Sequence, residues 1–197
     1  MIYFWQGNIE IEDELMMEFW KLASVSVTSH AIDFIGRNLK QSKEFVPQEV
    51  KVRLQHLLEF RLSNILSKED NERKKELQGF GWWFGSKVFE SGWSLKTLMA
   101  VLSQTNGMIK ADNEVVKGLA DMSSFHIAEV IDCLKQMVEA HKEPWGISLW
   151  IEGMRTILRV GLNSPELTIT SSATDLIHYL GSKGYLEFRD LVKNERI

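Results

Sequence analysis

Apolar residues recur at helical spacing along almost the whole chain, and this periodicity constrains the fold more than any other feature. In the segment 126–140 the large apolar residues fall three or four positions apart, which places them on one face of a helix. They are Ile127, Val130, Ile131, Leu134, Met137 and Val138. The pattern predicts a helix over 124–140, with Ser123 or Ser124 as its N-cap.

The same spacing continues on both sides of this helix. Pro144 interrupts it, because the residue before a proline avoids the α region, and the apolar run over 147–162 then predicts an antiparallel partner helix. Pro47 is expected to open a helix, Asp112 to cap one and Ser164 to cap another. We expect about nine helices and no strand. The further helices lie near 15–22, 32–39, 47–65, 95–102, 112–119 and 165–180.

Composition agrees with a helical fold. The chain has three prolines against eight methionines, seven tryptophans and ten phenylalanines, which suits long helices better than a sheet with many turns. At 197 residues, with 44% hydrophobic and 25% charged residues, it has the ordinary composition of one globular domain with a substantial core. We therefore predict an all-α fold.

The predicted helices group into pairs. Pair starts are separated by roughly 30 to 45 residues, the range of helical-hairpin repeats; they fall near Pro47, Ser91, Ser124 and Pro165. The whole chain, 1–197, is expected to form a single helical-repeat domain, in which 1–46 supply N-terminal capping helices and 47–191 form stacked helix pairs.

One segment resembles a known repeat. Residues 163–181, NSPELTITSSATDLIHYLG, are similar to the second helix of a HEAT repeat, with Pro165 in the opening turn, Ala173 as the small residue in mid-face and Leu180 near the end. The arginine usual in that motif is absent, and Thr170 or Ser171 stands in its neighbourhood.

A broader resemblance covers 77–191. The pieces LQGFGWWF, EPWGISLWIEGMRTIL and LGSKGYLEFRDL look like the helical-repeat segments at the C-terminal ends of large, mostly uncharacterised bacterial proteins. This resemblance implies a right-handed α-α superhelix, a HEAT/armadillo-like solenoid of about four helix pairs that serves as an interaction module. It brings no active-site residues with it.

The segment 77–89, LQGFGWWFGSKVF, has two interpretations. Gly79, Gly81 and Gly85 form GxGxxxG, one residue longer than the dinucleotide fingerprint, and the charged run 67–76 before it does not read as a strand. Glycines among large aromatic side chains let helices approach closely while the aromatic rings fill the space on either side. We therefore predict a packing joint here, preceded by a solvated run whose charges balance.

A protein-binding surface is the functional alternative for these aromatic residues. Tryptophans of this segment exposed on a concave surface would be favoured anchors for a partner. Two arginines four positions apart in the predicted helix 147–162 could form a ledge for an acidic peptide or a phosphate, although Glu152 could instead pair with the first of them. The candidate protein-binding residues are Trp82, Trp83, Trp150, Arg155 and Arg159.

Conventional catalytic and metal-binding patterns are missing from the sequence. The five histidines lie far apart, no HExxH or GxSxG motif occurs, and no two histidines are four positions apart. Cys133 lies within a predicted helix, where a small core residue is the simplest interpretation, and a lone cysteine forms no intramolecular disulfide. We expect no enzymatic activity, no cofactor and no metal.

Charge and hydropathy restrict the partners. The formal net charge of −4 disfavours broad nucleic-acid binding. The segment 36–61 is an exception with more bases than acids; its bases are Arg37, Lys40, Lys43, Lys51, Arg53 and Arg61. No apolar stretch is long enough to span a membrane and no signal-peptide pattern opens the chain, so we expect no membrane association and a reducing, cytoplasmic location.

Three functions remain open at this point. The favoured one is a non-enzymatic helical-repeat scaffold that binds another protein or peptide. The alternative is a nucleic-acid-binding HEAT-like repeat protein, which would need a basic groove with aromatic residues. An enzyme or sensor for a small molecule would need a deep pocket with converging polar groups between helices.

Overall fold

The computed structural model describes residues 18, 20–42, 46–64, 70–141 and 146–193. The described residues form helices and turns and contain no strand, as predicted. The α-helices are α3 (Val25–Gln41), α4 (Gln48–Asn64), α5 (Asp70–Leu77), α6 (Phe80–Ser86), α7 (Ser91–Thr105), α8 (Asp112–Met122), α9 (Ile127–Ala140), α10 (Ile151–Leu162), α11 (Leu167–Ser182) and α12 (Arg189–Lys193). Two single-turn 3-10 helices are η3 (Ser148–Trp150) and η4 (Leu186–Phe188).

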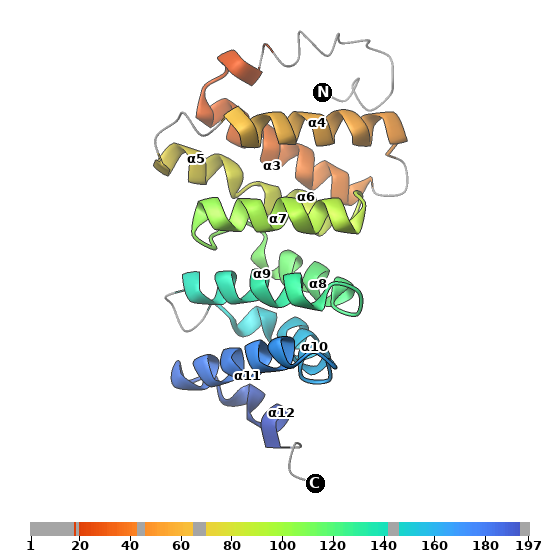
Figure 1. Cartoon of the computed structure of the whole chain (residues 1–197). Coiled ribbons are helices and arrows are strands. Elements are labelled where there is room, and N and C mark those ends of the chain that lie inside the picture. The colour runs from red at the N-terminus through yellow and green to blue at the C-terminus, as the bar shows by residue number, and fades with distance from the viewer. Residues whose placement is uncertain (1–17, 19, 43–45, 65–69, 142–145, 194–197) are drawn as a thin grey trace.

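The helices stack in two rows from the N-terminal to the C-terminal end of the molecule (Figure 1). In one row α6 packs on α3, α8 on α6 and α10 on α8. In the other, α9 packs on α7 and α11 on α9, while α4 joins α7 through a 2.8 Å hydrogen bond from Trp93 Nε1 to Glu59 Oε1. We call these the α3 row and the α4 row.

The predicted pair starts all identify helices of the α4 row. Pro47, Ser91, Ser124 and Pro165 lie at or shortly before the first residues of α4, α7, α9 and α11. The α3 helix falls inside 1–46, the segment expected to cap the stack, yet it packs on α6 as α8 does. Half of the predicted helix near 15–22 lies outside the described residues, and the described ones, 18 and 20–22, are helical.

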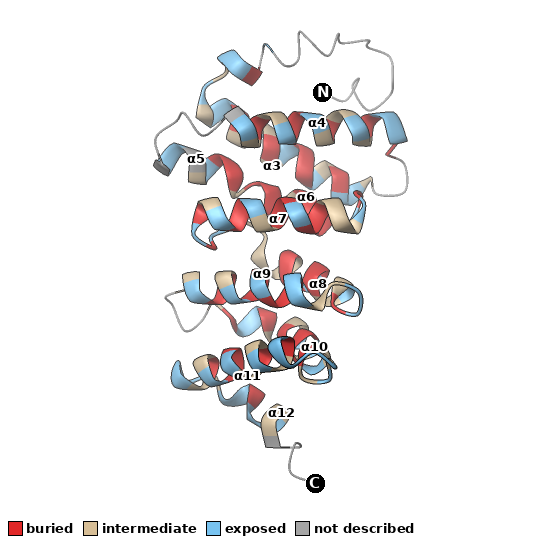
Figure 2. Cartoon of the chain, viewed as in Figure 1, coloured by how far each residue is buried: buried red, intermediate tan, exposed pale blue. Residues whose placement is uncertain are grey.

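A continuous apolar core lies between the two rows (Figure 2). Each helix from α3 to α11 except the short, charged α5 directs several large apolar side chains into it, as the helical periodicity predicted for the long helices. Burying one leucine or isoleucine side chain of this kind stabilises a fold by about 1.5–3 kcal/mol. Those with almost no exposed surface include Leu39, Leu54, Leu98, Leu119, Leu134, Ile157 and Leu180.

The predicted start of α9 is wrong by three residues. The helix begins at Ile127, and its N-cap residue His126 makes no side-chain capping bond. The hydroxyl of Ser123 donates instead to Ala120 O at 2.7 Å, and the amides of Phe125 and His126 bond back to Met122 O. The segment 123–126 thus completes the end of α8, so neither Ser123 nor Ser124 caps α9.

Two other predicted caps also differ. The α11 helix begins at Leu167, because Ser164 Oγ accepts a 3.3 Å hydrogen bond from Glu166 N and forms a turn before the helix. The α8 helix contains Asp112 as its first residue, and Ala111, in the left-handed region at φ 53°, precedes it.

Candidate functional site

The glycine- and tryptophan-rich segment forms α6, a helix of seven residues in the middle of the α3 row. Phe80, Trp83 and Phe84 are buried there against neighbouring helices. The Trp83 ring stacks on Phe89 with centroids 5.9 Å apart, and its Nε1 donates to Ile32 O at 2.8 Å. The short helix is therefore fixed to α3 by a directed hydrogen bond as well as by aromatic packing.

Glycines occur where α6 touches its neighbours most closely. A Cβ added at Gly81 would lie 1.8 Å from the carbonyl oxygen of Lys110, and one at Gly79 would lie 2.6 Å from Asp33 Oδ1. On the facing side, a Cβ on Gly36 of α3 would lie 2.6 Å from Trp82 Cβ. These contacts confirm the packing joint. The helix α5 precedes the segment, which contradicts the dinucleotide-binding interpretation.

Long charged side chains cross over α6 from α3 to the start of α8. Lys110 Nζ lies 2.6 Å from Asp33 Oδ2, and Lys40 Nζ lies 2.9 Å from Glu114 Oε2. The other oxygen of Glu114 is 3.6 Å from Lys117 Nζ. The hydrogen bond from Lys40 is the main cause that lowers the pKa of Glu114. The Lys40–Glu114 pair thus joins α3 to α8, and Lys110 joins the turn before α8 to α3, while α6 packs on both helices.

Trp82, on α6, is half-buried and packs beside Gly36 of α3. The guanidinium carbon of Arg37 is 4.7 Å from the centre of its ring, which is a cation–π contact. Trp82 Nε1 and Asp33 Oδ1 are buried and make no hydrogen bond within the described part of the chain. We call the surface formed by Asp33, Arg37, Lys40, Trp82, Lys110, Glu114 and Lys117 the α6 junction.

Two of the predicted binding residues belong to the core instead. Trp83 and Trp150 are each 1% exposed, so neither presents a surface to a partner. Trp150 packs on the ring of His141, with centroids 4.5 Å apart. Both side chains fill the space between the two rows, and this corrects the expectation that they anchor a partner.

Arg155 is occupied within the chain. Its Nη1 donates to Asp190 Oδ1 at 3.0 Å, its Nη2 donates to the other carboxylate oxygen, and Nη1 also donates to Glu187 O. The Asp190 carboxylate raises the pKa of Arg155, while Arg155 lowers the pKa of Asp190. Arg155 thus holds α10 to the C-terminal turn, whereas Arg159, one turn further along α10, is exposed.

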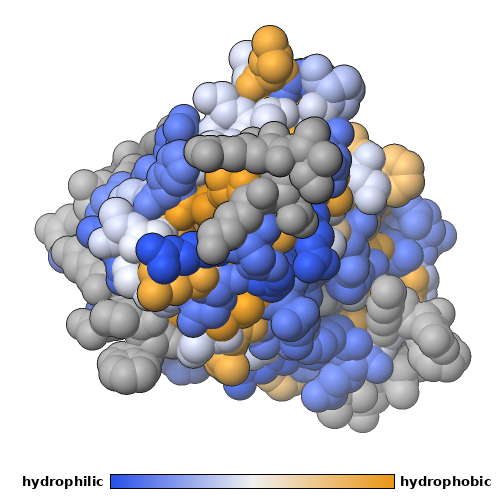
Figure 3. All heavy atoms as spheres, turned by 90° about the horizontal axis from the view of Figure 1, so that it is seen from below, coloured by the Kyte–Doolittle hydropathy of each residue, from blue (hydrophilic) through white to orange (hydrophobic). Residues whose placement is uncertain are grey.

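Of the predicted site residues, Trp82 and Arg159 therefore remain at the surface of the α3 row, on α6 and α10. An apolar area also lies at the C-terminal end of the stack (Figure 3). Leu186 is exposed at that end, and Leu191 and Val192 are partly buried. This apolar area includes none of the predicted binding residues. Single exposed apolar side chains are ordinary on protein surfaces.

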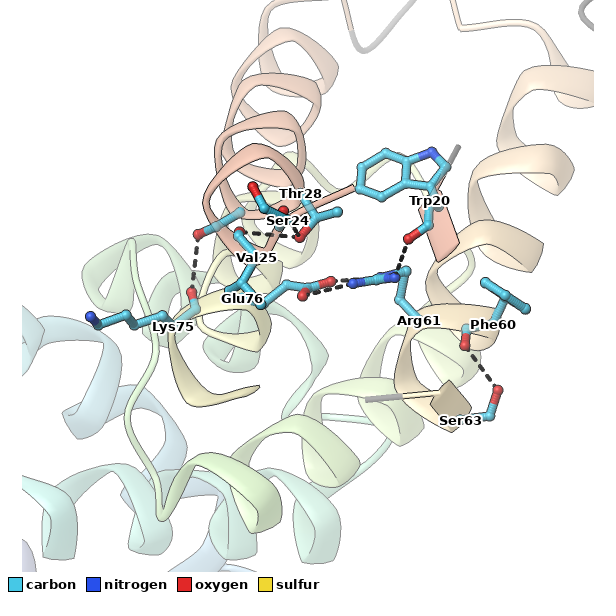
Figure 4. Close-up of polar contacts among 10 residues, drawn as sticks. Trp20, Ser24, Val25, Thr28, Phe60, Arg61, Ser63, Lys75 and Glu76 are labelled. Atoms are coloured by element: carbon cyan, nitrogen blue, oxygen red, sulfur yellow. Dashed lines mark hydrogen bonds and ion pairs between the residues drawn. The ribbon is translucent and has the colours of Figure 1, made fainter. Parts of the chain in front are cut away.

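A buried ion pair was not predicted from the sequence. Arg61 Nε lies 2.6 Å from Glu76 Oε1 and Arg61 Nη2 lies 2.8 Å from Glu76 Oε2. The third donor, Nη1, bonds to the carbonyl oxygen of Trp20 at 2.5 Å, so the guanidinium connects α4 and α5 with a residue five positions before the start of α3 (Figure 4). The side chains of Arg61 and Glu76 are only 4% and 0% exposed.

This pair corrects two expectations. Glu76 ends a charged run that was expected to be solvated, and Arg61 was counted with the bases of 36–61. The residues are 15 positions apart, on separate helices, and only the packing of α5 on α3 and α7 brings them together. Arg61 continues the helical spacing of Val50, Leu54 and Leu57 on the buried face of α4, a signal that the sequence interpretation did not use, whereas Glu76 stands in a run of charges without such spacing.

The described residues offer few other candidates for a reactive, metal-binding or membrane-spanning feature. Cys133 is buried, and burial raises its pKa to about 12, so the thiol stays protonated. No group of three or more histidine, cysteine, aspartate or glutamate side chains in the described ranges could hold a metal ion. None of the described helices combines the length and the apolar character needed to cross a bilayer.

Comparisons with protein families, with curated proteins and with solved structures gave no significant match to this chain.

Proposed function

We propose that this protein is a non-enzymatic helical-repeat scaffold, a HEAT/armadillo-like right-handed superhelix that binds another protein along the surface of its α3 row. The observation that carries the proposal is the stacking in two rows, in which α3, α6, α8 and α10 contact one another in order and α7, α9 and α11 do the same in the facing row. Repeats that stack in this manner create extended surfaces, which such proteins use for binding.

The residues along the α3 row suit a protein partner. Trp82 and Arg159 lie on this row with Arg37, and tryptophan and arginine are enriched at the centres of protein interfaces. Their helices are held in place by the core and by the α6 contacts, so a partner would meet preorganised side chains.

The charges along the same row favour nucleic-acid binding less than protein binding. Arg61 is buried with Glu76, and Lys40 is paired with Glu114, so part of the basic stretch 36–61 is compensated within the chain. A backbone of continuous phosphates needs an uninterrupted basic groove. The α8 helix instead carries Asp112, Glu114 and Asp121 against Lys117.

An affinity purification with matched variants tests the proposal. The tagged full chain, the Trp82→Ala/Arg159→Ala variant and a Lys135→Ala control would be used as baits in nuclease-treated extracts of the native host. Lys135 is an exposed cation on α9, in the opposite row. We expect a protein that the wild type and the control recover and that the double variant loses at least in part. Recovery of nucleic acid instead, or equal recovery by all three baits, would contradict the proposal.

A further inference from the structure

We infer that the α6 junction is a binding site for an acidic segment of a partner protein. This inference rests on the proposed scaffold function and specifies the chemistry of the segment that it recognises. The observations behind it are the balance of charge at the junction, the position of Arg37 on Trp82, and the distribution of acids along α8.

The junction carries an excess of positive charge. Four cations, Arg37, Lys40, Lys110 and Lys117, meet two carboxylates, Asp33 and Glu114. Asp33 neutralises Lys110, and Glu114 is shared between Lys40 and Lys117. Two positive charges therefore remain uncompensated, although the whole chain has a formal net charge of −4. Local potential, rather than total charge, determines which ligands a surface attracts.

Arg37 is placed to receive a carboxylate. Its guanidinium lies over the Trp82 ring, and none of the described carboxylates forms an ion pair with it. Stacking uses the flat face of the guanidinium and leaves the N–H groups along its edge to donate two parallel hydrogen bonds to one carboxylate. The ring also restricts the motion of the side chain, which reduces the entropy lost when a ligand binds.

Lys117 supplies the second uncompensated charge about one turn into α8. It is 57% exposed and shares Glu114 with Lys40 at the longer distance of 3.6 Å. A ligand carboxylate could therefore approach Lys117 without displacing the closer Lys40–Glu114 pair. Arg37 lies on α3 and Lys117 on α8, the two helices that pack on α6, so we expect the bound segment to be extended and to carry two or more acids.

The acids of α8 favour a short acidic segment over a long polyanion. Asp112 begins this helix, and Asp121 lies one turn beyond Lys117 and pairs with Lys87. A continuous phosphate backbone that crosses the junction would meet these carboxylates at both ends of α8, where like charges repel. A peptide can place its acids at the junction and neutral residues on either side.

The test uses fluorescence anisotropy with a fluorescein-labelled oligoglutamate peptide and the full chain. We expect saturable binding that weakens as salt is raised, because the cations are partly exposed. Arg37→Gln and Lys117→Gln should each weaken it by about two- to fivefold, the effect of losing one exposed ion pair. Arg37→Lys should recover little of the loss, since lysine lacks the planar fork. Lys96→Gln, an exposed cation on α7 in the other row, should leave the affinity unchanged.

Two results of the binding assay would overturn the inference. One is oligoglutamate binding that is absent or equally affected by Lys96→Gln and Arg37→Gln, in folded variants with wild-type circular dichroism. The other is tighter binding of a labelled single-stranded oligonucleotide, with the same dependence on Arg37 and Lys117. A partner recovered by affinity purification that is insensitive to Arg37→Gln but lost with Trp82→Ala/Arg159→Ala would retain the scaffold function and reject the acidic segment.

Discussion

Two of the ion-pair sets that join helices in this molecule lie in opposite surroundings. Arg61 and Glu76 connect α4 and α5 with side chains 4% and 0% exposed, and Arg61 also bonds to Trp20 O. At the α6 junction, Lys40 and Glu114 connect α3 and α8 with side chains 45% and 28% exposed. Both sets bridge residues distant in sequence, but only the second leaves cations near solvent.

The difference separates two roles of charge. A buried pair satisfied by several hydrogen bonds contributes little net stability over apolar residues, but the loss of one partner leaves an isolated buried charge. An exposed pair contributes about 0–1 kcal/mol and remains accessible to salt and ligands. The Arg61–Glu76 pair therefore fixes how helices meet, whereas the α6 junction can exchange its internal partners for a ligand.

The largest expected effect comes from breaking the buried pair. Glu76→Ala should lower the free energy of unfolding by about 3–5 kcal/mol, because Arg61 would remain charged without its carboxylate. Urea unfolding monitored by circular dichroism measures this. The Arg61→Met/Glu76→Leu double variant is the control and should recover most of the loss. A loss below about 1 kcal/mol in Glu76→Ala would mean that the pair is not buried in solution.

The next effect tests the close approach at α6. Gly81→Ala should destabilise the fold by about 1–3 kcal/mol, because its Cβ would lie 1.8 Å from the backbone oxygen of Lys110. Gly181→Ala is the matched control: nothing lies within 4 Å of an added Cβ at that α11 position. Alanine there should be neutral or stabilise by up to about 1 kcal/mol. Equal effects on thermal unfolding would contradict a tight joint.

The two adjacent tryptophans of α6 should differ in their effect on stability, by a smaller amount. Trp83→Phe removes the buried hydrogen bond to Ile32 O and should destabilise by about 1–2 kcal/mol. Trp82→Phe removes an N–H that has no acceptor in the described part of the chain, so it should change stability less. Denaturant midpoints of the two variants check the order, and a larger loss for Trp82→Phe would contradict it.

The smallest expected effect on stability comes from breaking the exposed Lys40–Glu114 pair. Lys40→Gln should lower stability by about 0.2–1 kcal/mol, and less at high salt. Because the pKa of Glu114 lies below its usual 4.5, its contribution is present above pH 4.5 and is lost as pH falls through the lowered pKa. Lys40→Gln should therefore reduce the loss of stability in that acidic range. An unchanged dependence on pH would show that the Lys40–Glu114 bridge does not form in solution.

The sequence predicts the helices better than the side chains that form the site. Apolar spacing gives α4, α7 and α10 because it reports which face of a long helix is buried. The seven residues of α6 are too few for that, so the spacing does not show that Trp83 points inward and Trp82 outward. The N-caps predicted at serines were also wrong, since Ser123 and Ser164 form hydrogen bonds in turns outside α9 and α11.

The ion pairs lay beyond sequence reasoning for a different reason. Arg61 and Glu76, like Asp33 and Lys110, come from separate helices whose relative position depends on packing of the whole stack. The spacing of α4 places Arg61 on its apolar face, but nothing in the sequence identifies Glu76, on another helix, as its partner. The glycines around α6 were the useful signal in the sequence. A side chain at these positions would clash with residues that form the ion pairs of the α6 junction.

The shortness of α6 also affects where the stack of helices would unfold locally first. Its seven residues link α3 to α8 in one row, while α7, with 15, continues the other. Should α6 melt locally, the N-terminal and C-terminal parts would stay connected mainly through the α7–α9 contact, so cooperativity would weaken at this point first. Amide hydrogens of α8 to α11 would then exchange as one block and those of α3 and α4 as another, and a ligand at the junction would couple the two.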